Sequence, residues 1–189
     1  MDINKILIDE FGIKPFQVKN TIQLIDEDNT IPFIARYRKE QTGNLKDTTL
    51  RELYDRLNYL RNLKDRQEEV IRLIAEQGKL TEELKEQILK AETLQRVEDL
   101  YRPYRPKRRT RATIAKEKGL EGLANTLWLQ ELEMGQLKQE VLSYIDEEKG
   151  VNTEEEALAG AMDIIAEMVS DNAEYRDIIR RVAYERGII

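Results

Sequence analysis

The sequence predicts an all-helical protein: a multi-helix array with a small N-terminal hairpin of the helix-turn-helix type, one long central helix and a basic loop that contains proline. Apolar residues recur at spacings of three and four along nearly the whole chain of 189 residues, which is the period of helices with one buried face. No stretch alternates between apolar and polar residues as a half-buried strand does. No proline lies between Pro32 and Pro103 or after Pro106, so long helices can run uninterrupted.

The N-terminal segment, residues 1–45, is predicted to be a helical hairpin followed by a short third helix. Apolar spacing indicates a helix over residues 3–11 and, after a turn at Gly12, a second helix that starts at Pro15 and turns polar residues such as Asn20 outward. This is the outline of a helix-turn-helix motif, whose second helix can enter the major groove of DNA. Any small helical hairpin has the same outline.

The third helix is expected within residues 31–43, Ile-Pro-Phe-Ile-Ala-Arg-Tyr-Arg-Lys-Glu-Gln-Thr-Gly. Pro32 suits the first turn of a helix, and Gly43 lies beyond its end. Phe33, Ile34 and Tyr37 are predicted to face the core. A second, smaller basic group is then left on the outside: Arg36, Arg38 and Lys39.

Residues 46–189 are predicted to be a helical scaffold that contains the basic loop 101–113. A capping box at Thr49 opens a helix that runs to Gln77, about 42 Å at ~1.5 Å per residue. Gln67 interrupts the heptad pattern of this helix, which favours a helix laid across its own domain over a coiled coil.

Further helices are expected on both sides of the loop. After it, Trp128 is a core candidate, Thr153 opens a helix through a second capping box, and Ser170-Asp171 caps the last helix. The apolar face of that helix leads directly to Gly187-Ile188-Ile189. We therefore expect a fragment of a longer multidomain protein, with an exposed apolar patch through which it self-associates.

The composition argues against an enzyme. Neither histidine nor cysteine occurs, which removes the usual general base, the usual zinc ligands and a thiolate nucleophile. Carboxylates at 146–148 and 154–156 lack a spaced ligand set and are interpreted as a solvated face. We predict no catalytic residue, no metal site and no cofactor. No apolar run approaches the ~20 residues of a membrane helix, and the start lacks a signal peptide, so we expect a cytoplasmic protein without a membrane partner.

The charge is distributed unevenly along the chain. The formal net charge is −6, yet residues 96–118 hold nine Lys and Arg against three acids, a net charge of +6, which leaves −12 for the rest. Residues 146–174 alone carry ten acids against Lys149, a net charge of −9. The sequence therefore has a positive middle and a negative C-terminal third.

Residues 101–111, Tyr-Arg-Pro-Tyr-Arg-Pro-Lys-Arg-Arg-Thr-Arg, concentrate cationic, aromatic and proline residues. As a polyproline II helix, with about three residues per turn, the segment would place its tyrosines on one edge and a comb of arginines on another. Such a comb suits phosphates and stacked bases. A solvated loop whose tyrosines pack on neighbouring helices is the other interpretation. The candidate nucleic-acid-binding residues of the loop are Tyr101, Arg102, Tyr104, Arg105, Lys107, Arg108, Arg109 and Arg111.

Four parts of the chain, in this order, resemble the N-terminal region of the Tex family of bacterial transcriptional accessory proteins. They are the segment 31–43, Leu-Arg-Glu-Leu with Leu-Asn-Tyr-Leu-Arg at 50–61, Glu-Gln-Gly-Lys-Leu-Thr at 76–81, and Asp-Leu-Tyr-Arg-Pro-Tyr-Arg-Pro-Lys-Arg-Arg-Thr-Arg-Ala at 99–112. Where the family commonly has Tyr-Leu-Pro-Tyr-Lys-Pro, this chain has arginine at both variable positions, which adds charge. The C-terminal third matches mainly in its helical pattern.

The resemblance implies a much longer protein in which an RNase-H-like domain, a helix-hairpin-helix module and an OB-fold RNA-binding domain follow this region. The family's RNase-H-like domain is generally considered inactive, which agrees with a non-enzyme. The OB-fold is the family's main nucleic-acid-binding element, so the basic loop would assist it.

Two functions are left open by the residues and the resemblance. In the first, the chain is the helical scaffold of a nucleic-acid-binding transcription factor, whose basic loop contacts RNA or DNA weakly and without sequence preference. In the second, it is an interaction and packing module that docks on its own C-terminal domains or on RNA polymerase, without direct contact with nucleic acid.

Overall fold

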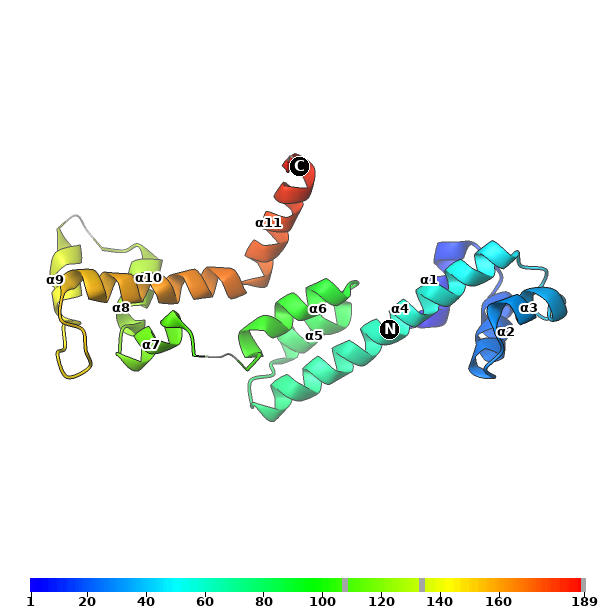
Figure 1. The fold of residues 1–189 in the computed structure, drawn as a ribbon, viewed down its shortest axis with the longest axis horizontal. Helices are drawn as coiled ribbons and strands as arrows, with labels where there is room; N and C mark the ends of the chain where they lie inside the picture. The colour runs from blue at the N-terminus through cyan, green and yellow to red at the C-terminus, as the bar shows by residue number, and fades with distance from the viewer. Residues whose placement is uncertain (107–108, 133–134, 188–189) are drawn as a thin grey trace. The chain divides into compact units, whose positions relative to one another are not determined.

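The structure, a computed structural model, describes residues 1–106, 109–132 and 135–187 (Figure 1). Within these ranges the chain forms eleven α-helices and one 3₁₀ helix, and its extended pairing amounts to an isolated bridge between Asp146 and Val151. The prediction of an all-helical fold is confirmed. The helices gather into two compact units, Met1–Val97 and Glu98–Ile189. The division of the chain into an N-terminal hairpin, residues 1–45, and a helical scaffold, residues 46–189, stays a prediction.

The first unit begins with the predicted hairpin, α1 (Ile3–Phe11) and α2 (Pro15–Asp26). Gly12 joins them at a φ of 60°, the left-handed conformation that glycine adopts without strain. The hairpin packs Leu7 and Val18, both fully buried, against Leu57 and Leu60 of the long helix α4 (Asp47–Glu76). Burial of these apolar side chains, and not intrinsic helix propensity, supplies most of the free energy that stabilises the hairpin on α4.

An ion pair reinforces the contact between the hairpin and α4. The Arg56 guanidinium donates hydrogen bonds of 2.7 and 2.6 Å to the two carboxylate oxygens of Glu10. These hydrogen bonds hold the pKa of the Glu10 carboxyl below its usual range, because they favour its charged form. The bidentate geometry fixes the orientation of α1 on α4.

The third helix, α3 (Ile31–Tyr37), buries Ile31 and Ile34 against Leu24 of α2 and Leu50 of α4. The prediction that Phe33 and Tyr37 face the core is wrong. Their side chains are 37% and 61% exposed. In a helix of seven residues Ile31 and Ile34 set the buried face, and residues 33 and 37, one turn apart, lie together on the outer side.

The long central helix is confirmed as α4, thirty residues with the predicted buried stripe. It begins two residues before Thr49, and no side chain caps its first turn, so the predicted capping box is not formed. The buried apolar residues of the stripe are Leu50, Leu53, Leu57, Leu60, Leu63, Val70 and Ile74.

Gln67, which breaks the heptad pattern, is buried and holds α4 to the carboxyl end of α5 (Glu82–Lys90). Its Nε2 donates to the main-chain oxygens of Ile88, Leu89 and Ala91 at 2.9, 3.3 and 2.9 Å. The last carbonyls of a helix have no partner within the helix. The glutamine therefore supplies a donor to the carbonyls at this end of α5, of which those of Ile88 and Ala91 are buried.

Replacing Gln67 with leucine is expected to lower the free energy of unfolding by about 1–3 kcal/mol, since buried carbonyl groups then lose their donor. Chemical denaturation measures the change. Gln87→Leu is the matched control, because Gln87 is exposed on α5. Exposed substitutions change stability by about 0.5 kcal/mol or less. Equal denaturation midpoints for the two variants would contradict this role of Gln67.

In the second unit, α10 (Glu154–Asp171) contacts α7 (Arg111–Glu117) and α8 (Glu121–Leu129), and α9 (Gln136–Leu142) packs beside them (Figure 1). Gly160 permits the close approach of α10 to the Leu120 side chain, because a Cβ at position 160 would lie 2.3 Å from Leu120 Cδ1. As predicted, Thr153 caps α10 by accepting from Glu156 N. The core consists of Ala112, Ala115, Leu120, Leu123, Ala124, Val141, Val151, Ala157, Ala161 and Ile164.

Two predictions about the end of this unit are wrong. Trp128 is 38% exposed and lies near the ring of Tyr175, with 6.5 Å between centroids, so it is not a core residue. The last helix, α11 (Ala173–Arg186), is capped by Asn172 and not by Ser170-Asp171. None of the described residues of α11 is buried, and its exposed apolar side chains include Ile178, Ile179 and Val182, which agrees with the expected apolar patch. Self-association through that patch stays a prediction.

Candidate nucleic-acid interface

The backbone of the basic loop is helical where the sequence predicted an extended conformation. Helix α6 (Leu94–Tyr101) passes directly into the 3₁₀ helix η1 (Arg102–Tyr104), and the chain becomes extended at Arg105. Pro103 fits η1 because the first turn of a helix leaves its N–H groups without a helical partner. The prediction of polyproline II geometry for residues 101–104 is therefore wrong. The candidates Lys107 and Arg108 lie outside the described residues.

The two tyrosines of the loop have different surroundings. Tyr101 is 5% exposed, and the Arg105 guanidinium lies 5.6 Å from the centroid of its ring. A buried ring offers no face to a base, so Tyr101 acts in packing. Tyr104 is partly exposed and stays a candidate.

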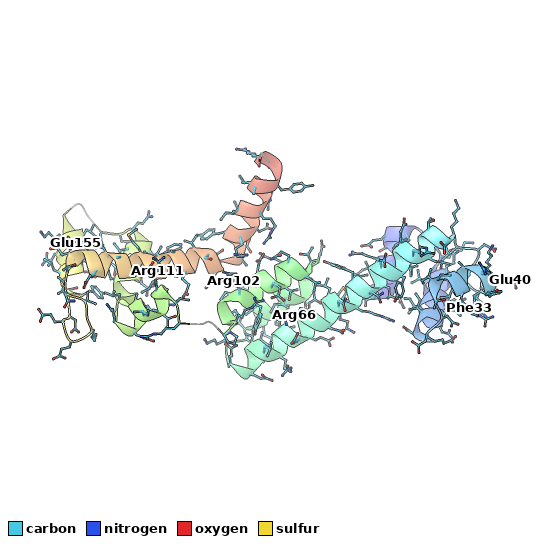
Figure 2. All side chains as sticks on the ribbon, viewed as in Figure 1. Phe33, Glu40, Arg66, Arg102, Arg111 and Glu155 are labelled. Atoms are coloured by element: carbon cyan, nitrogen blue, oxygen red, sulfur yellow. The ribbon has the colours of Figure 1, made fainter. Side chains whose placement is uncertain are left out.

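Each described arginine of the loop forms an ion pair with a carboxylate of its own unit. Arg102 lies 2.9 Å from Asp171, Arg109 2.7 Å from Glu117, and Arg111 3.6 Å from Asp163. Arg105 pairs with Glu98. Figure 2 labels Arg102 and Arg111 beside α10. The charges of these four arginines are thus neutralised locally by acids.

Helix α10 supplies two of these four acidic partners, Asp163 and Asp171, from a single stripe of acids. Asp163, Glu167 and Asp171 are four residues apart and so share a face of the helix. Glu167 forms an ion pair with Lys116 at 3.5 Å. It also accepts a hydrogen bond of 3.1 Å from the Thr110 hydroxyl, which caps α7 as well. This stripe was not predicted from the sequence, although the four-residue spacing of its acids indicates a shared helix face.

A buried carboxylate, also missed by the sequence analysis, ties α6 to α11. Asp99 is 1% exposed and accepts hydrogen bonds of 2.7 Å from both Arg176 Nε and Arg180 Nη2. The two arginines are one helical turn apart and converge on the same carboxylate. This cluster positions α11, whose own apolar residues are exposed.

Asp146, the first acid of the predicted solvated face, is engaged locally. Asp146 pairs with Lys149 at 3.0 Å and accepts from the main-chain N–H groups of Glu148 and Lys149. The hydrogen bond from the Lys149 side chain is the main cause that lowers the pKa of the Asp146 carboxyl. Across the described ranges, no group of three or more acids is arranged to hold a metal ion. Among the described helices, none has the length and apolar character that a membrane span requires.

The smaller basic group lies on the outer face of α3 and in the turn after it. Arg36, Arg38 and Lys39 are exposed, and the ion pairs of the described residues include none of the three. The neighbouring turn covers part of α2, since Asn20 Nδ2 donates to the Gln41 oxygen at 2.8 Å. One polar side chain predicted to face outward, as in a helix-turn-helix motif, is thus used to hold the turn.

Among the residues that the structure describes, the helical scaffold thus carries a basic loop whose arginines are paired with acids and a basic face on α3 whose cations form no ion pair. Comparison with known proteins shows what this scaffold is similar to. Residues 1–75 match the model of the Tex-like protein N-terminal domain. The resemblance of this chain to the N-terminal region of the Tex family, which the sequence motifs predicted, is confirmed.

Three relatives illustrate the range of the similarity. An uncharacterised Bacillus subtilis protein, YdcI, is 49% identical over 95% of this chain and 25% of its own length. The transcriptional accessory protein Tex of Neisseria gonorrhoeae is 42% identical over 95% of this chain and 23% of its length. The S1 RNA-binding domain-containing protein 1 of Homo sapiens is 33% identical over 99% of this chain and 18% of its length. The chain thus spans about a quarter or less of these relatives.

Proposed function

We propose that this chain is the N-terminal helical scaffold of a nucleic-acid-binding transcriptional accessory protein. We also propose that its basic loop acts mainly as a packing joint, that is, a segment whose ion pairs hold it against the neighbouring helices. The names of the relatives support the first part, because one is a transcriptional accessory protein and another contains an S1 RNA-binding domain. The observation that carries the second part is the ion pairing of Arg102, Arg105, Arg109 and Arg111.

The pairs limit what the loop contributes to phosphate binding. A cation that moves from a carboxylate to a phosphate leaves the carboxylate behind, and that negative charge repels the nucleic acid. The pairs are not buried, since the four arginines are 42–85% exposed, so each adds only about 0–1 kcal/mol to stability. Their main effect is to cancel the charge of the loop.

Salt dependence of binding to single-stranded RNA tests the proposal. Replacing Arg102, Arg105, Arg109 and Arg111 together with glutamine is expected to change the slope of log K against log salt by less than about one unit. Four phosphate contacts would contribute about 0.7 each on single strands. Circular dichroism confirms folding of the variant. A slope that flattens by about three units would establish the loop as a direct phosphate-binding element and overturn the packing role.

A second variant, Lys107→Gln with Arg108→Gln, tests the two loop cations outside the described residues. If this variant alone flattens the slope by about 1.4 units, binding by the loop resides in Lys107 and Arg108. In that case the paired arginines keep the packing role, and these two residues become the nucleic-acid contact.

A further inference from the structure

The outer face of α3 and the turn after it carry an arginine-aromatic surface that is built differently from the loop. We define the α3 surface as five exposed residues: Phe33, Arg36, Tyr37, Arg38 and Lys39. Figure 2 labels Phe33 on α3 and Glu40 in the turn. All five lie within a single short segment of the first unit.

The rings of the α3 surface lie together and carry guanidinium groups over them. The centroids of Phe33 and Tyr37 are 5.2 Å apart, with 46° between the ring planes. Arg38 Cζ lies 5.3 Å from the Phe33 centroid, and Arg36 Cζ lies 6.0 Å from that of Tyr37. Two exposed aromatic rings, each next to a cation, form a platform on which a flat ring with a nearby negative charge can stack.

The charge of the α3 surface is not cancelled. Residues 31–46 contain four cations, Arg36, Arg38, Lys39 and Lys46, against the single acid Glu40, so their net charge is +3. No ion pair in the described part of the chain engages Arg36, Arg38 or Lys39. Against a chain of net charge −6, the rest of which is therefore −9, this segment presents a local positive potential.

The backbone that carries these side chains is held firmly. The buried hydroxyl of Thr42 donates to the Arg38 and Lys39 oxygens at 3.3 and 3.1 Å. Gln17 Nε2 of α2 donates to the Thr42 and Gly43 oxygens at 3.2 and 3.0 Å. A turn fixed in this way loses little conformational entropy when a ligand binds.

We propose that the α3 surface binds single-stranded nucleic acid. Its cations complement the phosphates, and its rings give stacking faces to bases that are not already stacked in a duplex. An acidic protein segment would satisfy the cations but would leave the rings without a flat partner. The inference goes beyond the proposed function, since the loop can be a packing joint whether or not α3 contacts nucleic acid.

Two double variants separate the charge from the rings, measured by fluorescence anisotropy with labelled oligouridylate and oligothymidylate. Arg36→Gln with Arg38→Gln is expected to flatten the salt slope by about 1.4 units, since each phosphate contact contributes about 0.7. Phe33→Leu with Tyr37→Leu is expected to leave the slope unchanged and to weaken binding at least about fivefold, because stacking contributes about 1–3 kcal/mol per base.

The matched control is Arg51→Gln with Arg72→Gln. Both arginines are exposed on α4 and paired within that helix, so the control makes the same change in net charge. Comparison of the two oligonucleotides distinguishes RNA from DNA as the ligand. For a duplex of the same length, the ring variant and the parent protein are expected to bind with equal affinity.

Two results would overturn the inference. In the first, both α3 variants bind the oligonucleotides with the affinity and slope of the control. In the second, the arginine variant loses binding to polyglutamate while its oligonucleotide binding is unchanged, which would assign the surface to an acidic protein partner. Circular dichroism of each variant excludes unfolding as the cause, and Phe33 and Tyr37 are exposed enough to be replaced without disturbing the core.

Discussion

Replacing Arg176 and Arg180 together with alanine is expected to release α11 from the second unit. The carboxylate of Asp99 is buried, and removing the partners of a buried charge costs about 3–5 kcal/mol. None of the described residues of α11 is buried, so its position depends largely on the Asp99 cluster, together with the ring contact between Trp128 and Tyr175. The main effect should therefore be local opening and not loss of the core around Leu120 and Ile164.

Hydrogen exchange measures this effect directly. The amides of α11 are expected to exchange about a hundredfold faster or more in the double variant, since about 3 kcal/mol of local stability is lost, while the amides of α10 keep their protection. Arg181→Ala is the control, because Arg181 pairs with Asp177 inside α11 at 3.0 Å. Unchanged protection of α11 in the double variant would show that the Asp99 cluster does not anchor the helix.

The fold could be predicted from the sequence because its determinants are local. The three-four spacing of Leu50, Leu53 and Leu57 specifies both that α4 is a helix and which face it buries. Such reasoning fails for short helices. In α3 two assignments of the buried face fit the apolar residues equally well, and packing on Leu24 and Leu50 selects the one that exposes Phe33 and Tyr37.

The candidate interface could be predicted only in part, because composition shows total charge but not pairing. The sequence favoured the loop over Arg36 and Arg38, since the loop has more cations. The fold brings acids of α10 to that loop, whereas the ion pairs of the described residues include none with Arg36, Arg38 or Lys39, and this contrast underlies our proposal for the α3 surface. These contacts with α10 join residues 51 to 69 positions apart in the chain, from Lys116 with Glu167 to Arg102 with Asp171, so local patterns do not contain them.

Neutralising the acidic stripe of α10 is expected to increase nucleic-acid binding. Asp163→Asn, Glu167→Gln and Asp171→Asn keep the size of each side chain and remove the charges that engage Arg111, Lys116 and Arg102. Three released cations, at about 0.7 per phosphate, should steepen the salt slope on single strands by about two units and tighten binding about tenfold at low salt.

A control with the same net charge makes this test specific. Glu147→Gln, Glu148→Gln and Glu185→Gln remove three exposed acids of the same unit. Both triple variants change the net charge from −6 to −3, so a general electrostatic effect would be equal in the two. Thermal unfolding of each variant confirms that the unit remains folded.

The salt slope of the stripe variant relative to this control tests most directly whether α10 occupies the cations of the basic loop. We predict a slope steeper by about two units for the stripe variant on single-stranded RNA, with a change of less than about half a unit for the control. Equal slopes and affinities for the two variants would contradict the account, because the loop cations would then not be held by α10.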